Sequence, residues 1–146
     1  METRPTAFLS DFGLIDPYVG ICHGVMLGVD PELTVIDLAH CIPRQDVLAG
    51  AVALAEAAPF TPDRCVFLAV VDPGVGSDRR AVAIESRDGC HLVGPDNGLL
   101  LPAAQARGGV NSAVDISLSE WRLTPTSRTF HGRDIFAPVA ARLACG

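Results

Sequence analysis

Apolar residues in this chain fall into short runs separated by stretches with helical spacing. The first run, TAFLS at residues 6–10, ends at Asp11, Phe12 and Gly13. A later run, CVFLAVV at 65–71, is apolar without alternation, which is typical of a strand covered on both faces, as in a parallel sheet. The pattern therefore predicts buried strands at these two places. Further predicted strands lie at 34–38, 81–85, 91–93 and 113–116.

Helices are predicted between these runs. In YVGICHGVMLGV at 18–29, apolar side chains recur every three or four residues. Asp16 and Pro17 precede it, so we expect Asp16 to cap this helix and Pro17 to begin it. An alanine-rich helix is predicted at 47–58, before Pro59. Shorter helices are predicted at 99–106 and 134–143, the latter capped by Asp134, with Arg133 and Asp134 as surface or cap charges.

Strands that alternate with helices around one core predict an α/β domain. We expect three α/β/α layers, a Rossmann-like arrangement with a largely parallel central sheet. Ligands bind such sheets beyond the carboxyl ends of the strands. Asp11, Asp72 and the turn at 95–98 each follow a predicted strand. We therefore expect these polar side chains to meet at one edge of the sheet.

Size and composition fit one domain. The chain has 146 residues, 49% of them hydrophobic, and a formal net charge of -6. The acidic balance disfavours nucleic-acid binding, which usually involves a basic surface. No apolar stretch approaches the roughly 18 to 20 residues that a membrane span needs. The five cysteines form no CxxC pair, and the odd number predicts free thiols in a reducing cytoplasm.

The turn VVDPGVGSDRR at 70–80 contains the first candidate pair. Pro73, Gly74 and Gly76 predict a tight excursion of the backbone. Arg79 can then fold back over Asp72, seven residues earlier. Such a pair is commonly structural, and it would also suit a site that holds a water molecule or a cation.

Three other residues are candidates for a site. Asp11 either accepts backbone N–H bonds in its turn or accepts two hydroxyls of a ligand diol. Asp16 is a better candidate for a helix cap than for a ligand contact. His131 precedes Gly132 at the start of the last predicted helix, where it is either a packing residue or a site residue.

Metal and nucleotide sites are not supported. His23, His40 and Cys41 do not have the spacing of zinc ligands. The glycines of the 70–80 turn are not followed by the Lys-Ser/Thr ending of a phosphate-binding loop, and the sequence contains no GxGxxG.

Four stretches in this order resemble the S-adenosylmethionine hydroxide adenosyltransferases, relatives of the fluorinase and chlorinase enzymes. They are SDFGLIDPYVG (10–20), IPRQDVLAGA (42–51), VVDPGVGSDRR with VGPDNGLL (70–80 and 93–100), and FHGRDIFAPVAA (130–141). The resemblance implies hydrolysis of S-adenosyl-L-methionine to adenosine and L-methionine by in-line attack of water or hydroxide at C5′. It implies no cofactor, because S-adenosyl-L-methionine is the substrate.

The resemblance also implies residue roles. Asp72, Arg79 and His131 match the catalytic set of the hydroxide branch, with Asp72 and His131 polarising the water and Arg79 fixing Asp72. A carboxylate at position 72 disfavours the halide branch. Asp11 would bind the ribose hydroxyls and Asp16 would face the methionine end. The other implied substrate contacts are Gln45, Val75, Asn97, Phe130 and Gly132.

Members of the resembled family carry a second, β-barrel domain and form trimers in which the pocket lies between neighbouring subunits. Residues 1–146 are expected to be the first, catalytic domain alone: a fragment, a truncated form or a single-domain member. A homotrimer is expected if the second domain is present. Two alternatives stay open, a non-catalytic domain that binds S-adenosylmethionine or adenosine, and a metal-dependent hydrolase that uses the carboxylates.

Overall fold

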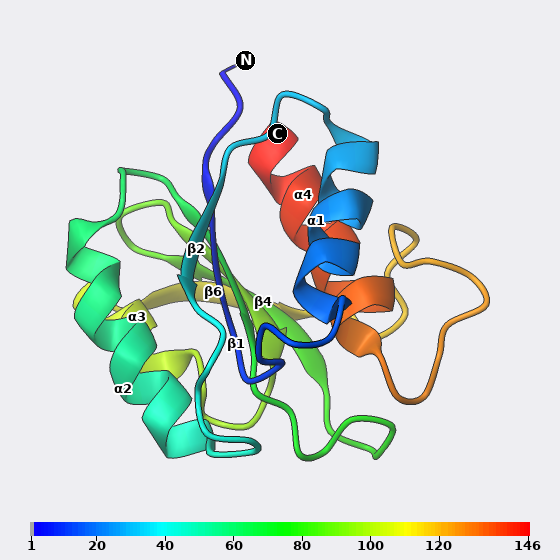
Figure 1. Cartoon of the computed structure of the whole chain (residues 1–146). Coiled ribbons are helices and arrows are strands. Elements are labelled where there is room, and N and C mark those ends of the chain that lie inside the picture. Colours follow the sequence, from blue (N-terminus) through cyan, green and yellow to red (C-terminus); the bar gives the residue numbers. More distant parts are fainter. Residues whose placement is uncertain (1) are drawn as a thin grey trace.

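A six-stranded sheet forms the centre of the protein, in the order β2-β1-β3-β5-β4-β6 (Figure 1). The computed structural model describes residues 2–146. Strands β1, β2, β3 and β5 are mutually parallel, and β4 runs antiparallel to both β5 and β6. The predicted largely parallel sheet is thus confirmed. The strands are β1 (Thr6–Ser10), β2 (Val35–Ala39), β3 (Val66–Val70), β4 (Ala81–Ser86), β5 (His91–Pro95) and β6 (Val110–Asp115).

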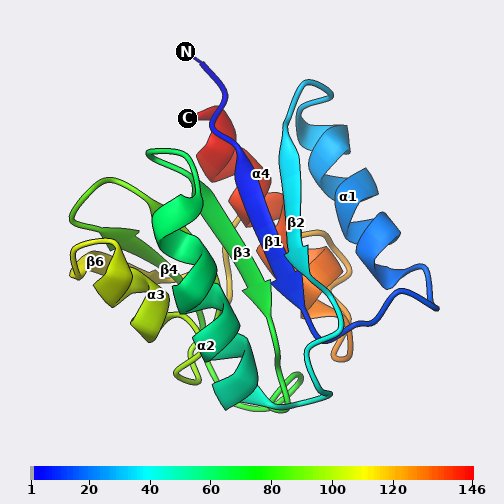
Figure 2. The same ribbon diagram turned by 60° about the vertical axis from the view of Figure 1, so that its left-hand side comes forward.

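Helices cover both faces of the sheet, which confirms the three layers. Helices α1 (Tyr18–Val29) and α4 (Ala137–Cys145) pack together on one face. Helices α2 (Val47–Ala57) and α3 (Leu101–Ala106) pack together on the other (Figure 2). A 3₁₀ turn, η1 (Ala58–Phe60), follows α2.

Two hydrophobic cores explain why the central strands are apolar without alternation. Side chains of β1 alternate between the cores: Phe8 packs toward α1 and α4, whereas Leu9 packs toward α2 and α3. Leu68 and Phe67 divide in the same way on β3. Every residue of β1 and β3 is buried. A strand between two helical layers needs apolar side chains on both faces, as the sequence predicted.

Two predicted helix caps are wrong. Helix α1 begins at Tyr18 with Pro17 in the cap position and no capping side chain, so the exposed Asp16 does not cap it. Asp134 is neither a cap nor a surface charge, because it is buried inside a π-helical turn, η2 (Gly132–Phe136), that precedes α4. Its carboxylate accepts hydrogen bonds from the Ser127 backbone N–H at 2.7 Å and from Arg133. The π turn therefore binds the preceding loop instead of being capped by it.

Substitution of a glycine in the sheet tests how closely neighbouring strands pack. A Cβ at Gly94 on β5 would lie 2.4 Å from the Ala69 carbonyl oxygen of β3, a backbone atom that cannot give way. We expect Gly94→Ala to lower the free energy of unfolding by about 2 kcal/mol or more. Gly24→Ala is the matched control, because a Cβ there meets nothing within 4 Å and α1 gains a better helix former. Urea denaturation should show a large loss for Gly94→Ala and a gain of about 0.5–1 kcal/mol for Gly24→Ala. Equal midpoints for the two variants would contradict this packing.

Candidate functional site

A cavity of about 350 Å³ opens at the carboxyl ends of β1 and β3. Four segments that are distant in sequence contribute to it, as expected for the ligand-binding edge of an α/β sheet. It is lined by Asp11, Phe12, Tyr18, Arg44, Gln45, Val70, Asp72, Val75, Thr129, Phe130, His131 and Gly132.

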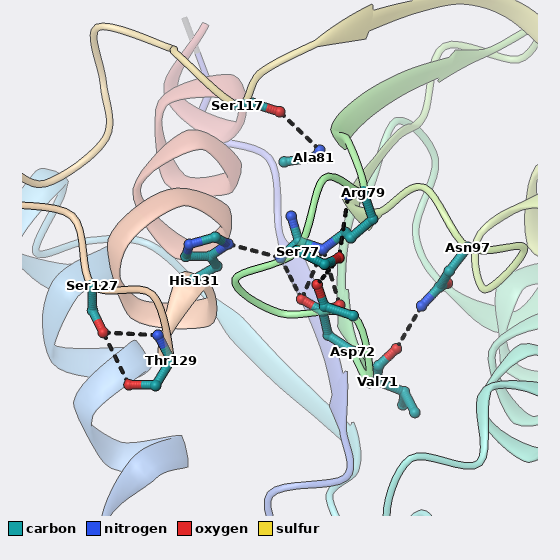
Figure 3. Close-up of polar contacts among 11 residues, drawn as sticks. Val71, Asp72, Ser77, Arg79, Ala81, Asn97, Ser117, Ser127, Thr129 and His131 are labelled. Carbon is teal, nitrogen blue, oxygen red and sulfur yellow. Dashed lines mark hydrogen bonds and ion pairs between the residues drawn. The ribbon is translucent and has the colours of Figure 1, made fainter.

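The predicted pair of Asp72 and Arg79 forms in the turn after β3 (Figure 3). Gly76 adopts a φ of 78°, and the Ser77 hydroxyl donates to the Gly74 carbonyl at 2.5 Å, so the turn closes tightly. Arg79 Nε donates to the two carboxylate oxygens of Asp72 at 2.9 and 3.1 Å, and Nη2 also pairs with Oδ2. The side chains of Asp72 and Arg79 are only 5% and 11% exposed. This is a largely desolvated, multidentate ion pair.

His131 joins the pair from the other end of the chain. Its Nδ1 lies 2.7 Å from Arg79 Nη2, although the two residues are 52 positions apart (Figure 3). A guanidinium can only donate, so Nδ1 accepts this hydrogen bond and the imidazole proton resides on Nε2. Burial of His131 lowers the pKa of its imidazole, and so does the positive charge of Arg79, while Asp72 acts in the opposite sense. The contact therefore favours a neutral imidazole of one tautomer.

The segment that carries His131 is held against the turn by backbone packing. A Cβ at Gly76 would lie 2.4 Å from the Arg128 carbonyl oxygen, so only glycine allows this approach. The Arg128 guanidinium also lies 3.5 Å from the Gly76 carbonyl oxygen. Ser127 Oγ accepts from the Thr129 backbone N–H at 3.0 Å and fixes the bend that leads to His131 (Figure 3). The turn and this segment therefore depend on each other for their positions.

Asp11 lines the cavity at the end of β1, next to the end of β3. Its Oδ2 accepts from the Gln45 backbone N–H at 2.8 Å. Gln45 has a φ of 62°, a left-handed conformation that is costly for a residue with a side chain. Within residues 2–146, Oδ1 of Asp11 accepts no hydrogen bond. The carboxylate is thus anchored by one oxygen, and the other is available to a ligand hydroxyl.

Three aromatic rings line the cavity beside Asp11. Phe130 meets Phe12 and Tyr18 edge to face, at ring-centroid distances of 5.7 and 5.4 Å. A Cβ at Gly132 would lie 2.9 Å from the Phe12 ring, so this glycine makes room for the aromatic cluster.

Most of the candidates from the sequence meet at this cavity, and two do not. Asp11, Asp72, His131, Gln45, Val75, Phe130 and Gly132 line it, and Arg79 lies behind Asp72. Asp16 is exposed and is not among the lining residues. Asn97 Nδ2 donates to the Val71 carbonyl at 2.9 Å, so this side chain supports the end of β3 instead of lining the cavity.

Sequence reasoning missed five lining residues, Phe12, Tyr18, Arg44, Val70 and Thr129. Each lies within or directly before one of the stretches that carry the family resemblance, SDFGLIDPYVG, IPRQDVLAGA, VVDPGVGSDRR or FHGRDIFAPVAA. The available signal was adjacency to the marked carboxylates and histidine.

No group of three or more histidine, cysteine or acidic side chains within residues 2–146 is arranged to hold a metal ion. His23 and His40 instead share the Asp37 carboxylate, at 3.0 and 2.7 Å from its Oδ1, while Cys41 is exposed. None of the helices in this described part of the chain is long and apolar enough to cross a membrane.

Comparison with known proteins identifies a family and several related enzymes. Residues 6–146 match the SAM hydroxide adenosyltransferase N-terminal domain. The chain is 56% identical over 140 residues to the (R)-S-adenosyl-L-methionine hydrolase of Salinispora tropica, covering 96% of this chain and 53% of that protein. It is 29% identical over 162 residues to the fluorinase of Nocardia brasiliensis, covering 96% of this chain and 54% of that protein.

A similar solved structure is that of an uncharacterized conserved protein from Thermotoga maritima. It has a TM-score of 0.92 and 39% sequence identity, covering 97% of this chain and 54% of that one. The chain thus spans about half the length of the curated relatives it matches.

The pKa of His131 tests the cluster. Arg79→Gln removes a positive charge that lowers this pKa, so we expect the pKa to rise. Asp72→Asn removes a negative charge that raises it, so we expect the pKa to fall further below the ordinary value. NMR titration of the His131 ring protons measures both changes. If the two variants moved the pKa in the same direction, or not at all, the three side chains would not be in contact.

Proposed function

Because the chain belongs to the SAM hydroxide adenosyltransferase family, we propose that its cavity holds S-adenosyl-L-methionine and serves its hydrolysis to adenosine and L-methionine. The observation that carries this proposal is the contact of Asp72, Arg79 and His131 at the wall of the cavity. The names of the hydrolases to which the chain is similar support it.

The reaction is a displacement at the 5′ carbon. A bond forms from the water oxygen to C5′, the C5′–S bond breaks, and methionine leaves as a neutral thioether, so no general acid is needed. The water loses one proton to an acceptor in the cavity, which then releases it to solvent. What the protein must supply is the orientation and partial deprotonation of the water.

The hydrogen-bond directions divide these roles. Nδ1 of His131 is occupied by Arg79, so the imidazole carries its N–H at Nε2, and the Ser127 backbone also hydrogen-bonds the ring. Asp72 lines the cavity and presents carboxylate lone pairs. We therefore assign the acceptance of the water proton to Asp72 and the orientation of the water to His131. Arg79 fixes both partners, and its fork geometry is not reproduced by lysine.

Other lining residues account for substrate recognition. The available oxygen of Asp11 suits a ribose hydroxyl. The π faces of Phe12, Tyr18 and Phe130 attract a cation such as a sulfonium. A carboxylate at position 72 would repel a halide, which favours water over halide as the nucleophile.

The coverage of the relatives favours one second candidate. Because the chain spans about half of their length, the described cavity can be part of a larger site, and the chain by itself would then bind S-adenosylmethionine or adenosine without turnover. The hydrolysis proposal also holds that a second domain completes the site in a homotrimer and that no cofactor takes part. It further holds that the protein works in the cytoplasm and that nucleic acid is not a partner.

Turnover in H₂¹⁸O tests the hydrolysis. We expect equal amounts of adenosine and methionine, with ¹⁸O in the adenosine 5′-hydroxyl, because water attacks C5′. Asp72→Asn and His131→Ala should each slow the reaction by about 10² or more. Arg79→Lys should also be slower than wild type, because lysine lacks the guanidinium fork. Mass spectrometry of the products measures label and rate. Unlabelled adenosine, or wild-type rates in both variants, would refute the mechanism.

A second experiment distinguishes an enzyme from a binding module. The assay is run on this chain alone and with the C-terminal half of the Salinispora tropica hydrolase supplied, each before and after chelation of metals. Binding of S-adenosylmethionine without product in both cases would favour the binding module. Loss of turnover on chelation would favour the metal-dependent alternative.

Asp11 should act on binding more than on chemistry. Asp11→Asn keeps the size of the side chain but removes the charge that accepts the ribose hydroxyl, so we expect binding of S-adenosylmethionine to weaken about tenfold or more. Isothermal titration measures the Kd, and Asp63→Asn, at a fully exposed position outside the cavity, is the control. Equal effects of the two substitutions would remove Asp11 from the ribose site.

A further inference from the structure

A second cavity, of about 400 Å³, lies against the same cluster. Arg79 and His131 line it, whereas Asp72 and His131 line the first cavity. The cluster of Asp72, Arg79 and His131 therefore lies between the two. The outer wall of the second cavity comes from the loop after β6, through Ser117, Arg122 and Thr124 among others.

Arg79 has hydrogen-bond donors left for this cavity. Of its five N–H groups, Nε and the two on Nη2 bind Asp72 and His131. The two N–H groups of Nη1 have no partner within residues 2–146. The side chain is 11% exposed, and its guanidinium carbon lies 5.4 Å from the centre of the Phe136 ring. Nη1 is not among the buried unpaired atoms of the described chain, so it reaches the space of this cavity and can donate to a solute there.

Other residues that line the second cavity also carry hydrogen-bond donors. Arg122 uses Nη1 to bind the Ser119 carbonyl at 3.0 Å, and in the described chain no carboxylate lies within ion-pair distance of it. Ser117 Oγ accepts from the Ala81 backbone N–H at 3.0 Å (Figure 3), and its hydroxyl also hydrogen-bonds the Asp115 carboxylate, so it is not a free donor. The Thr124 hydroxyl makes no hydrogen bond in the part of the chain that the structure describes.

The cavity is chemically one-sided. Its lining holds two guanidinium groups, an imidazole and several hydroxyls, and no aspartate or glutamate. The protein has a formal net charge of -6, so a lining with two guanidinium groups and no carboxylate differs from the overall acidic balance. Guanidinium and hydroxyl donors together match the oxygens of a phosphate-like anion.

We propose that the second cavity binds a small inorganic oxyanion, held between Arg79 and Arg122 with the hydroxyl of Thr124. The anion takes the free edge of the same guanidinium that binds Asp72 and His131. Occupation of this cavity is therefore felt at the candidate site, and the binding itself is independent of any turnover of S-adenosylmethionine.

Isothermal titration with inorganic phosphate, at constant ionic strength set with chloride, tests the proposal. We expect saturable binding that perturbs the NMR signals of the His131 ring. Arg122→Gln should weaken this binding about tenfold or more, and Thr124→Val, of nearly equal shape, should weaken it less. Arg80→Gln is the control, because Arg80 is exposed, pairs with Asp96 and lies outside the cavity, so its Kd should stay within about twofold of wild type.

Three results would overturn the proposal. They are the absence of saturable binding, equal weakening in Arg80→Gln and Arg122→Gln, and binding that leaves the His131 signals unmoved. No S-adenosylmethionine is present in the titration, so failure here leaves the hydrolysis proposal standing, and failure of hydrolysis leaves this one standing.

Discussion

The candidate site depends on the hydrogen bonds that the Arg79 guanidinium donates to Asp72 and His131. Nε and Nη2 hold the Asp72 carboxylate, and Nη2 also donates to His131. Both ion-pair partners are nearly buried, and removing one member of such a pair commonly costs about 3–5 kcal/mol. One cation thus fixes a carboxylate as an acceptor and an imidazole as a neutral donor on the wall of a cavity.

The fold brings these groups together through two irregular segments. The turn after β3 presents Asp72 and folds Arg79 back over it, and Gly76 lets that turn approach the Arg128 backbone. The π turn η2 follows His131 directly, and its buried Asp134 binds the loop at Ser127. Such turns are frequent at functional sites, because they place side chains where a regular helix could not. The regular sheet and helices provide the rigid frame that both segments need.

Much of the fold was readable from the sequence because burial leaves a pattern. The apolar runs of β1 and β3 predict their two covered faces, and the carboxylates after them predict the edge at which a ligand would bind. Capping was misjudged at Asp16 and Asp134, because a cap depends on where a side chain folds and not on its position before a helix. The π turn has no signature in apolar spacing. The contact of Arg79 with His131 spans 52 positions, and local patterns cannot show it. The family resemblance implied this contact. It also implied a substrate contact for Asn97, which stays a prediction, and the structure shows Asn97 bound to the carbonyl of Val71.

The protonation state of the two ring nitrogens of His131 tests the central contact most directly. ¹⁵N NMR distinguishes a protonated from an unprotonated imidazole nitrogen in the wild-type chain at neutral pH. If Arg79 donates to Nδ1, that nitrogen will carry no proton and Nε2 will carry one. A protonated Nδ1, or a mixture of the two tautomers, would contradict the arrangement from which the account of the site is built.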